Sequence, residues 1–110
     1  MASKKSRAVF LDRDGVIIEE VNYLSRLEQL RLIPGSARAI ARLRKAGFKV
    51  VVVTNQSGVA RGYLTLRTLR EIHGLLKRRL ARDRAKLDGL YFCPHLPGQG
   101  CSCRKPEVGT

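Results

Sequence analysis

The segment FKVVVVTN, at residues 48–55, constrains the fold of this chain more than any other stretch. Its four consecutive valines, Val50 to Val53, favour a strand because branched side chains pack well on a pleated surface. A strand that is apolar at every position is buried on both faces, which is typical of a parallel sheet. Parallel strands need crossover connections, so this segment also limits what its neighbours can form.

The residues before this segment supply a second strand and a crossover helix. AVFLD at residues 8–12 predicts a buried strand. PGSARAIARLRKAG at residues 34–47 predicts a helix with Ser36 as a possible N-cap and Gly47 as its stop. Strand, helix and strand in this order predict a right-handed parallel crossover.

The alternation continues after residue 55. Residues 65–87 predict the longest helix, with Thr65 as its N-cap and His73 in its middle, where we expect a structural or solvent-exposed side chain. The apolar stripe of this helix consists of Leu69, Ile72, Leu76 and Leu80. LDGLYFC at residues 87–93 predicts a third, shorter strand. The pattern predicts a doubly wound α/β fold, a Rossmann-like parallel sheet with flanking helices, as one domain over residues 1–110.

Composition limits the classes of protein to which the chain can belong. Its 110 residues and 44% apolar content suit one globular domain. The apolar runs are too short for a membrane span or a secretory signal, so we expect a cytoplasmic protein without membrane association. Its 22 basic against 9 acidic residues give a net charge of +13, which predicts attraction to nucleic acid, anionic membrane or a phosphorylated small molecule.

Polar side chains follow the predicted strands at their carboxyl ends, where open α/β sheets bind ligands. Asp12 and Asp14 follow the first strand, Thr54 and Asn55 end the second, and residues 93–105 follow the third. If the first strand continues through both acids, their side chains point to the same side and converge on one ligand. Two carboxylates at such a short distance repel each other unless a cation, a shared proton or a positively polarised backbone lies between them.

A Mg²⁺ ion accounts for the acids and for a phosphate near them, because it takes carboxylate and phosphate oxygens together. TNQSGVARG at residues 54–62 adds the Thr54 hydroxyl and a turn that can aim backbone N–H groups at an anion, although it also fits an ordinary polar turn. With the metal in place, Asp12 is the candidate nucleophile that forms an aspartyl phosphate. Asp14 is the candidate acid and base.

Two further patterns follow the third strand. CRKP contains Arg104 and Lys105, which suit phosphate oxygens but in so basic a chain also fit solvent-facing positions. Three clustered cysteines and one histidine favour metal ligation over a disulfide framework, with three free thiols as the alternative. We predict a closed structural Zn²⁺ site in the loop at residues 93–103, with the ligands Cys93, His95, Cys101 and Cys103.

Together these motifs resemble the haloacid dehalogenase superfamily of phosphatases. FLDRDGV is similar to its first motif, Thr54 in VVVTNQSG to its second, and Lys105 in CRKP to its third. The resemblance implies Asp12 as the nucleophile and Asp14 as the general acid and base. It also implies that Thr54 and Lys105 stabilise the phosphoryl group, and that Mg²⁺ binds the Asp12 carboxylate and the Asp14 backbone carbonyl.

Within that superfamily, TNQSGVARG together with CPH and CSCRKP most resembles the branch that releases the 7-phosphate of D-glycero-D-manno-heptose 1,7-bisphosphate. The likeness extends over residues 8–106 and implies a zinc loop and a segment near the sugar at residues 20–23. The substrate contacts that it implies are Asn55, Gln56, Ser57 and Arg104. Histidinol-phosphate phosphatases resemble the chain in the first motif and the zinc loop, but NQSGVARG fits the heptose branch better.

The resemblance also implies that part of the catalytic domain is missing. Members of the superfamily continue into a further strand with an acidic residue that completes the Mg²⁺ site, whereas this chain stops at Thr110. We therefore expect a truncated, monomeric chain with weak Mg²⁺ binding and little turnover, or a catalytically inactive remnant. A zinc-containing nucleic-acid-binding module is a further alternative, although a chain with 5% aromatic residues offers no stacking platform.

Overall fold

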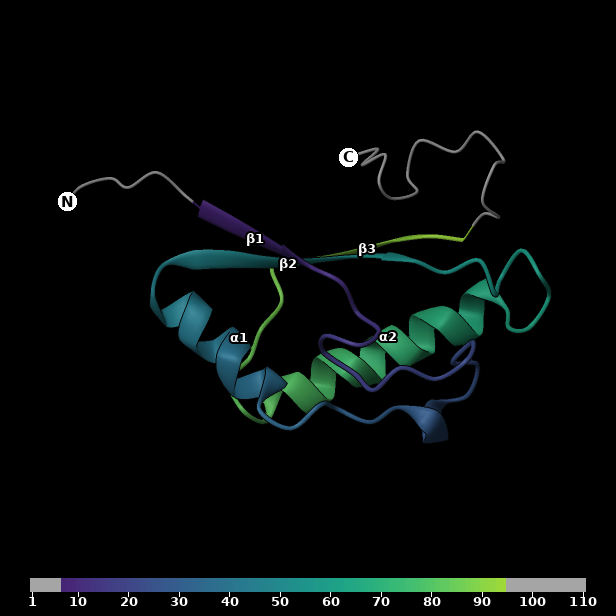
Figure 1. Cartoon of the computed structure of the whole chain (residues 1–110), viewed down its shortest axis with the longest axis horizontal. Helices are drawn as coiled ribbons and strands as arrows, with labels where there is room; N and C mark the ends of the chain where they lie inside the picture. Colours follow the sequence, from purple (N-terminus) through teal and green to yellow (C-terminus); the bar gives the residue numbers. More distant parts are fainter. Residues whose placement is uncertain (1–6, 95–110) are drawn as a thin grey trace.

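The computed structural model describes residues 7–94, in which strands and helices alternate (Figure 1). The elements are β1 (Arg7–Leu11), the short 3₁₀ helix η1 (Leu27–Gln29), α1 (Ser36–Lys45), β2 (Phe48–Asn55), α2 (Leu66–Ala81) and β3 (Gly89–Cys93). This alternation confirms the predicted α/β class. Neither described helix has the length and apolar run that crossing a bilayer requires.

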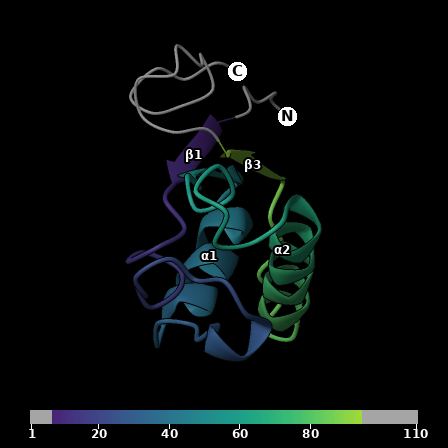
Figure 2. The ribbon, with the colours of Figure 1, turned by 90° about the vertical axis from the view of Figure 1, so that its right-hand side faces the viewer.

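The three strands form one parallel sheet in the order β1, β2, β3. The predicted valine strand is the central one and keeps its predicted limits. Val50 and Val52 are fully buried on the face that meets the helices. An unbroken apolar run predicts burial on both faces of a strand, whereas within residues 7–94 helices cover one face of β2 and Val51 on the other face is half-buried (Figures 1 and 2).

Both helices lie on the same face of the sheet (Figures 1 and 2). Parallel crossovers are right-handed as a rule, and each of these two leads to the next strand in the same direction across the sheet. Two such crossovers place their helices on the same face of the sheet. Phe10 and Tyr91 pair with Val51 and Val53 on the opposite face, and their side chains are 63% and 54% exposed. The predicted doubly wound arrangement, with helices on both faces, is therefore not seen within residues 7–94.

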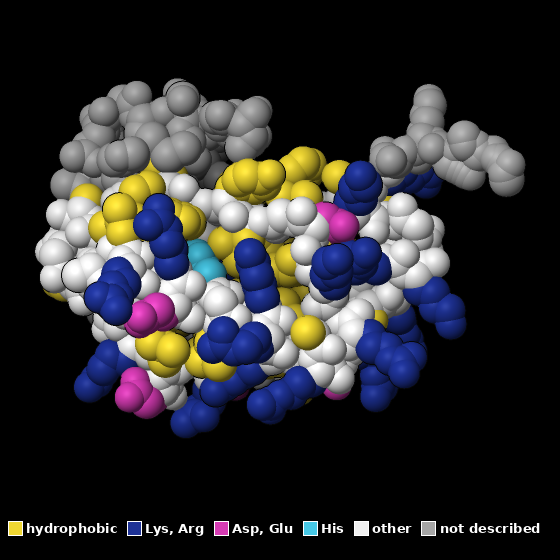
Figure 3. All heavy atoms as spheres, turned by 180° about the vertical axis from the view of Figure 1, so that it is seen from behind, with side chains coloured by type: hydrophobic (Ala, Val, Ile, Leu, Met, Phe, Trp, Pro, Cys, Tyr) yellow, Lys and Arg dark blue, Asp and Glu magenta, His cyan; other side chains and the backbone are white. Residues whose placement is uncertain are grey.

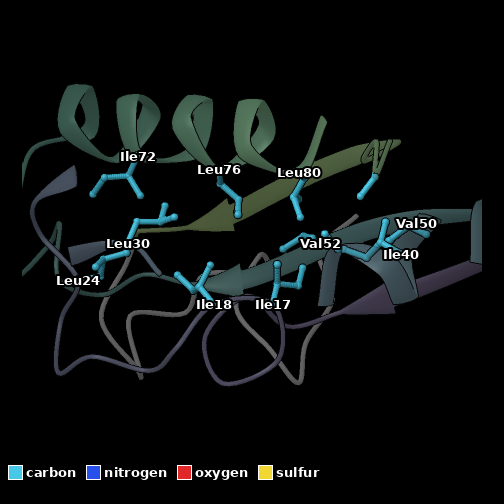
Figure 4. Packing of buried hydrophobic residues seen from close by; sticks show 12 residues of the cluster. Ile17, Ile18, Leu24, Leu30, Ile40, Val50, Val52, Ile72, Leu76 and Leu80 are labelled. Atoms are coloured by element: carbon cyan, nitrogen blue, oxygen red, sulfur yellow. The ribbon is translucent and has the colours of Figure 1, made fainter. Parts of the chain in front are cut away.

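The core lies between α2, the sheet and the segment that joins β1 to α1 (Figure 4). The predicted stripe of α2 is confirmed, because Leu69, Ile72, Leu76 and Leu80 are all fully buried. The joining segment adds Ile17, Ile18, Leu24 and Leu30, each at most 2% exposed. Residues 12–35 are thus anchored by core side chains, which fixes the polar residues between them.

The first helix begins differently from the prediction. Gly35, with φ of +87°, is the N-cap, and Ser36 is the first helical residue. The Ser36 hydroxyl is not a cap, because it donates to the Ile17 carbonyl at 3.0 Å. Gly47, with φ of +97°, follows the helix as predicted, since glycine adopts this left-handed conformation without a steric penalty.

The second helix begins as predicted but ends earlier. The Thr65 hydroxyl accepts a hydrogen bond from the Thr68 N–H at 3.0 Å, which confirms the N-cap. The helix ends at Ala81, because Arg84 takes a φ of +60° and the Ala85 N–H turns back to the Leu80 carbonyl at 3.0 Å. A short connection then leads to β3.

Candidate active site

The two predicted acids lie on a tight turn directly after β1. The strand ends at Leu11, so the alternation of an extended strand does not relate Asp12 to Asp14 as predicted. The Arg13 carbonyl accepts hydrogen bonds from the N–H groups of Ile17 and Ile18 at 3.0 and 3.1 Å. Such closure needs a residue with positive φ, and Gly15 supplies it at +81°. The turn thereby fixes the backbone on both sides of Asp14.

The Asp14 carboxylate is held by two side chains. Arg13 donates from Nε to Oδ1 and from Nη2 to Oδ2, each at 3.0 Å. Gln56 donates from Nε2 to Oδ2 at 3.1 Å. The Asp14 side chain is 28% exposed, whereas that of Arg13 is 1% exposed. The carboxylate is therefore fixed from the protein side and open on the other.

Arg13 is a buried cation whose three guanidinium nitrogens all have partners. Besides Asp14, it donates from Nη2 to the Gln56 carbonyl oxygen and from Nη1 to His73 Nε2, each at 3.0 Å. Burial lowers the pKa of Arg13, and the charge and hydrogen bonds of Asp14 oppose that shift. Removing one partner of a buried ion pair is strongly destabilising because it leaves the other charge uncompensated, so the residues of this cluster depend on one another.

Gln56 extends this cluster to Thr54, the predicted phosphoryl-stabilising residue. Its Nε2 lies 2.7 Å from Thr54 Oγ1, and both side chains are buried. The Gln56 N–H also donates to the Cys93 carbonyl at 2.7 Å, which ties the end of β2 to the end of β3. A carboxylate, an amide and a hydroxyl are thus aligned along the carboxyl edge of the sheet.

A pocket of about 280 Å³ opens beside these residues. It is lined by residues 13–14, 20–24 and 55–58, which belong to three separate segments. The segments that sequence reasoning assigned to the substrate, residues 20–23 and Asn55 to Ser57, therefore meet at one cavity. A larger hollow of about 680 Å³ lies over α2 but contains none of the predicted site residues.

Two residues that line the pocket, Tyr23 and Gly58, are packed closely by their neighbours. Tyr23 has a φ of +55°, and its ring lies 4.7 Å from that of Tyr63. The Arg61 guanidinium carbon lies 5.8 Å from the centre of the Tyr23 ring. A Cβ atom at Gly58 would lie 3.3 Å from Tyr23 Cδ1 and 3.0 Å from Leu64 Cδ2. The absence of a side chain at Gly58 therefore allows this wall to pack.

Several predicted site residues lie outside this geometry. Asp12 is exposed, directly follows β1 and does not line the pocket, whereas Asn55 lines the pocket and pairs in register with Cys93. Cys93 is disulfide-bonded, and residues 7–94 hold no group of three or more acidic, histidine or cysteine side chains that would form a metal site. The remaining predicted residues, His95, Cys101, Cys103, Arg104 and Lys105, lie outside the described part of the chain.

His73 has a contact that the sequence did not indicate. Its side chain is buried, which agrees with the structural alternative expected for it, and its Nε2 lies 3.0 Å from Arg13 Nη1. Burial, together with the positive charges of Arg13 and Lys77, lowers the pKa of His73 to about 3, so the ring is neutral. The flanking acids Asp12 and Asp14 are a signal that Arg13 could be buried as an ion pair. No local pattern indicates that His73, which lies 60 residues further along the chain, is its second partner.

Basic side chains are spread over one face of the molecule (Figure 3). Lysine and arginine are distributed across the face shown in Figure 3, with few acidic side chains between them. They are not gathered into one strip of the kind that tracks a nucleic-acid backbone. The charge excess by itself therefore does not define a binding site on this face.

Comparison with known proteins gives a consistent result. Residues 9–73 match the family model of haloacid dehalogenase-like hydrolases. The D-glycero-beta-D-manno-heptose-1,7-bisphosphate 7-phosphatase of Pseudomonas putida is 47% identical over 94% of this chain and 59% of that protein. The corresponding protein of Pseudomonas aeruginosa is 45% identical over 92% of this chain and 57% of that protein.

The likeness extends to solved structures. The crystal structure of D,D-heptose 1,7-bisphosphate phosphatase from B. bronchiseptica, complexed with magnesium and phosphate, has a TM-score of 0.87 at 42% identity. The superposition covers 94% of this chain and 58% of that one. The chain thus spans slightly under three fifths of the length of these relatives.

Proposed function

Because this chain belongs to the haloacid dehalogenase-like hydrolases, we propose that it hydrolyses a phosphate monoester, with Asp12 as nucleophile and Asp14 as general acid and base. The observation that carries this proposal is the alignment of Asp14, Gln56 and Thr54 beside a pocket of about 280 Å³. Its other wall consists of residues that the family resemblance assigns to the substrate. A cavity that combines acids, an amide and a hydroxyl suits a small phosphorylated ligand.

The proposed reaction has two steps. An oxygen of Asp12 attacks phosphorus, the bond from phosphorus to the leaving oxygen breaks, and a proton from Asp14 neutralises the leaving alkoxide. Asp14 then takes a proton from water, which attacks the aspartyl phosphate and releases inorganic phosphate. Thr54 already accepts a hydrogen bond from Gln56, so its own hydroxyl proton is the donor proposed for a phosphoryl oxygen.

Mg²⁺ is the proposed cofactor of this site. Asp12 is exposed at the end of β1 and would offer its carboxylate, and Asp14 would offer its backbone carbonyl. Mg²⁺ is commonly bound by one or two carboxylates together with waters and phosphate oxygens. The described donors therefore fit the ion without a complete protein cage. When bound at Asp12 and Asp14, it would neutralise the charge between carboxylate and phosphate. The magnesium and phosphate in the related B. bronchiseptica structure support the proposal.

The finer proposal for the substrate is D-glycero-D-manno-heptose 1,7-bisphosphate, with release of the 7-phosphate. It is supported by the names of the relatives and by the lining of the pocket with Asn55, Gln56 and Ser57. Histidinol phosphate is the alternative substrate. Four further expectations stay predictions: low turnover by these 110 residues, a monomeric state, a cytoplasmic location and the lack of nucleic-acid binding.

The test is phosphate release with Mg²⁺, measured in single turnover with protein in excess so that slow catalysis is detected. We expect release from the heptose bisphosphate to exceed release from histidinol phosphate, and to be abolished in Asp12→Asn. Equal rates for wild type and Asp12→Asn would rule out the proposed nucleophile. Faster release from histidinol phosphate would shift the assignment to the alternative substrate.

A structural Zn²⁺ ion in the loop at residues 93–103 is a separate proposal. It is supported by the ligand spacing of Cys93, His95, Cys101 and Cys103. The sulfur of Cys93 is oxidised in a disulfide and must be a thiolate to bind zinc. Elemental analysis of freshly reduced protein should therefore give one zinc per chain, and oxidised protein should give none. Zinc-free reduced protein would contradict the proposal.

A further inference from the structure

We propose that His73 is a positioning residue for the Asp14 carboxylate and acts through the Arg13 guanidinium. The catalytic part of this inference rests on the acid and base role proposed above for Asp14. Neither His73 nor Arg13 belongs to the set of residues that the sequence motifs assign to the reaction. Both are connected to Asp14 by hydrogen bonds that join α2 to the turn after β1.

The geometry gives Arg13 two opposed edges. One edge, Nε and Nη2, holds both oxygens of Asp14 at 3.0 Å. The other nitrogen, Nη1, lies 3.0 Å from His73 Nε2. A guanidinium is planar and rigid, so a partner that fixes one nitrogen fixes the direction of the others. His73 therefore sets the plane in which Arg13 presents its N–H groups to Asp14.

The chemistry of the contact requires a neutral ring at His73. Arginine nitrogens only donate, so Nε2 must accept and the ring proton must lie on Nδ1. The burial of His73 and the neighbouring charge of Arg13, which lower its pKa to about 3, keep the ring in this neutral form. Lys77, which lies exposed on α2, adds to this effect without taking part in the contact.

This arrangement is costly for stability, which favours a functional reason for it. His73 Nδ1 is buried and has no hydrogen-bond partner among residues 7–94. A buried donor without a partner lowers stability, and an apolar side chain at position 73 would carry no such donor. Packing alone would therefore be served as well by an apolar side chain at this position. An acceptor for Arg13 is what histidine adds.

A positioned general acid matters most when the leaving group is a poor one. A sugar alkoxide must receive a proton as it departs, whereas p-nitrophenolate leaves without one. Loss of the His73 contact should therefore slow turnover of a sugar phosphate more than that of p-nitrophenyl phosphate. Damage to the fold alone would lower both rates by the same factor.

The first experiment tests the contact without turnover. In ¹⁵N-labelled protein, the Arg13 Nε–H signal is assigned by its loss in Arg13→Lys, and its hydrogen exchange is measured. We expect exchange at least tenfold faster in His73→Leu, which has no acceptor, and within threefold of wild type in His73→Gln, whose amide oxygen restores one. Lys77→Met is the matched control, because it removes a neighbouring charge and leaves the contact, and its exchange should equal that of wild type.

The second experiment tests the effect on catalysis. We expect His73→Leu to lower kcat for the sugar phosphate at least tenfold with KM within twofold, and kcat for p-nitrophenyl phosphate less than threefold. His73→Gln should recover most of the loss. Circular dichroism shows whether His73→Leu is folded. If it is not, Arg13→Lys, which keeps the charge but loses the two-pronged grip on Asp14, is compared with wild type on both substrates.

The outcomes separate this inference from the proposed function. Unchanged exchange of the Arg13 Nε–H in folded His73→Leu would overturn the inference that His73 holds the Arg13 guanidinium in place. Equal losses on both substrates would overturn the positioning role. If wild type turns over neither substrate, the proposed function fails for this chain. The exchange data then decide by themselves whether His73 fixes the Arg13 guanidinium, which binds the Asp14 carboxylate.

Discussion

Gln56 donates a hydrogen bond to the Asp14 carboxylate across 3.1 Å, although the two residues lie 42 positions apart in the chain. The same amide nitrogen lies 2.7 Å from Thr54 Oγ1, and the amide oxygen accepts from Arg13 at 3.0 Å. Gln56 therefore joins the end of β2 to the turn after β1. Its amide is suited to this place because one end donates and the other accepts.

Gln56→Glu should disrupt this connection. The new carboxylate would keep an acceptor for Arg13 but would face Asp14 with a like charge and no proton to donate. We expect the free energy of unfolding at pH 7 to fall by about 1–3 kcal/mol, the usual loss for a buried polar group that loses its partner. Urea denaturation measures it, and the loss should shrink at low pH, where the added carboxyl group is protonated.

The matched control for Gln56→Glu is Asn22→Asp. Asn22 lines the same pocket but is exposed, so its substitution adds the same charge without breaking the buried cluster. Its effect on unfolding should be within about 0.5 kcal/mol, as for most surface substitutions. Equal losses in the two variants would mean that net charge, and not the contact with Asp14, is responsible.

Replacement of two glycines, Gly58 and Gly74, by alanine should change the free energy of unfolding in opposite directions. At Gly58 the added Cβ would lie 3.0 Å from Leu64 Cδ2 and 3.3 Å from Tyr23 Cδ1, so we expect a loss of about 1–3 kcal/mol from overpacking. Gly74 lies inside α2, and its Cβ would meet Arg78 at an ordinary 3.5 Å. Gly74→Ala should stabilise the protein by about 0.5–1 kcal/mol, because it reduces the entropy of the unfolded chain. Urea denaturation measures the free energy of unfolding of both variants. A change of the same sign in the two variants would contradict this account.

The pKa of His73 predicts how stability changes with pH. It is about 3 in the folded protein against 6.5 as the ordinary value, so between these limits the unfolded state binds the extra proton. Stability is then complete above about pH 6.5 and falls as the pH is lowered towards 3, at most on the order of 1.4 kcal/mol per pH unit. Urea denaturation at pH 7, 6 and 5 should show this slope in wild type.

His73→Gln provides the reference for that slope, because it keeps an acceptor for Arg13 and does not titrate. The difference in unfolding free energy between wild type and His73→Gln should therefore shift in favour of the variant as the pH falls. All other titrating groups are common to both proteins and cancel in the difference. A difference that stays constant from pH 7 to pH 5 would contradict a buried, neutral His73.

The N-cap of α2 should contribute measurably to stability. The Thr65 hydroxyl satisfies the Thr68 N–H, one of the donors that lack a partner at the start of a helix. We expect Thr65→Ala to lower the free energy of unfolding by about 1 kcal/mol, and Thr65→Ser to retain most of it because serine keeps the hydroxyl. Urea denaturation followed at 222 nm measures both, and equal effects of alanine and serine would mean that the hydroxyl is not the cause.

Local sequence patterns predicted most of the secondary structure. The valine run of β2, the stripe of α2 and the cap at Thr65 depend on neighbours within four residues, so they can be read from the chain itself. The misassigned features depend on longer contacts. The pattern predicts Ser36 as the N-cap, but its hydroxyl donates to the carbonyl of Ile17, which is buried in the core, and Gly35 is the N-cap.

The same division applies to the candidate site. The sequence alone identified which strand ends carry Asp14, Thr54 and Gln56, because parallel strands place their carboxyl ends at one edge. Only the tertiary structure decided that Arg13 and Gln56 hold the Asp14 carboxylate, and that His73 is its indirect partner. That contact depends on how α2 docks against the turn after β1, and the docking is set by core packing between residues far apart in the chain, which no local pattern records.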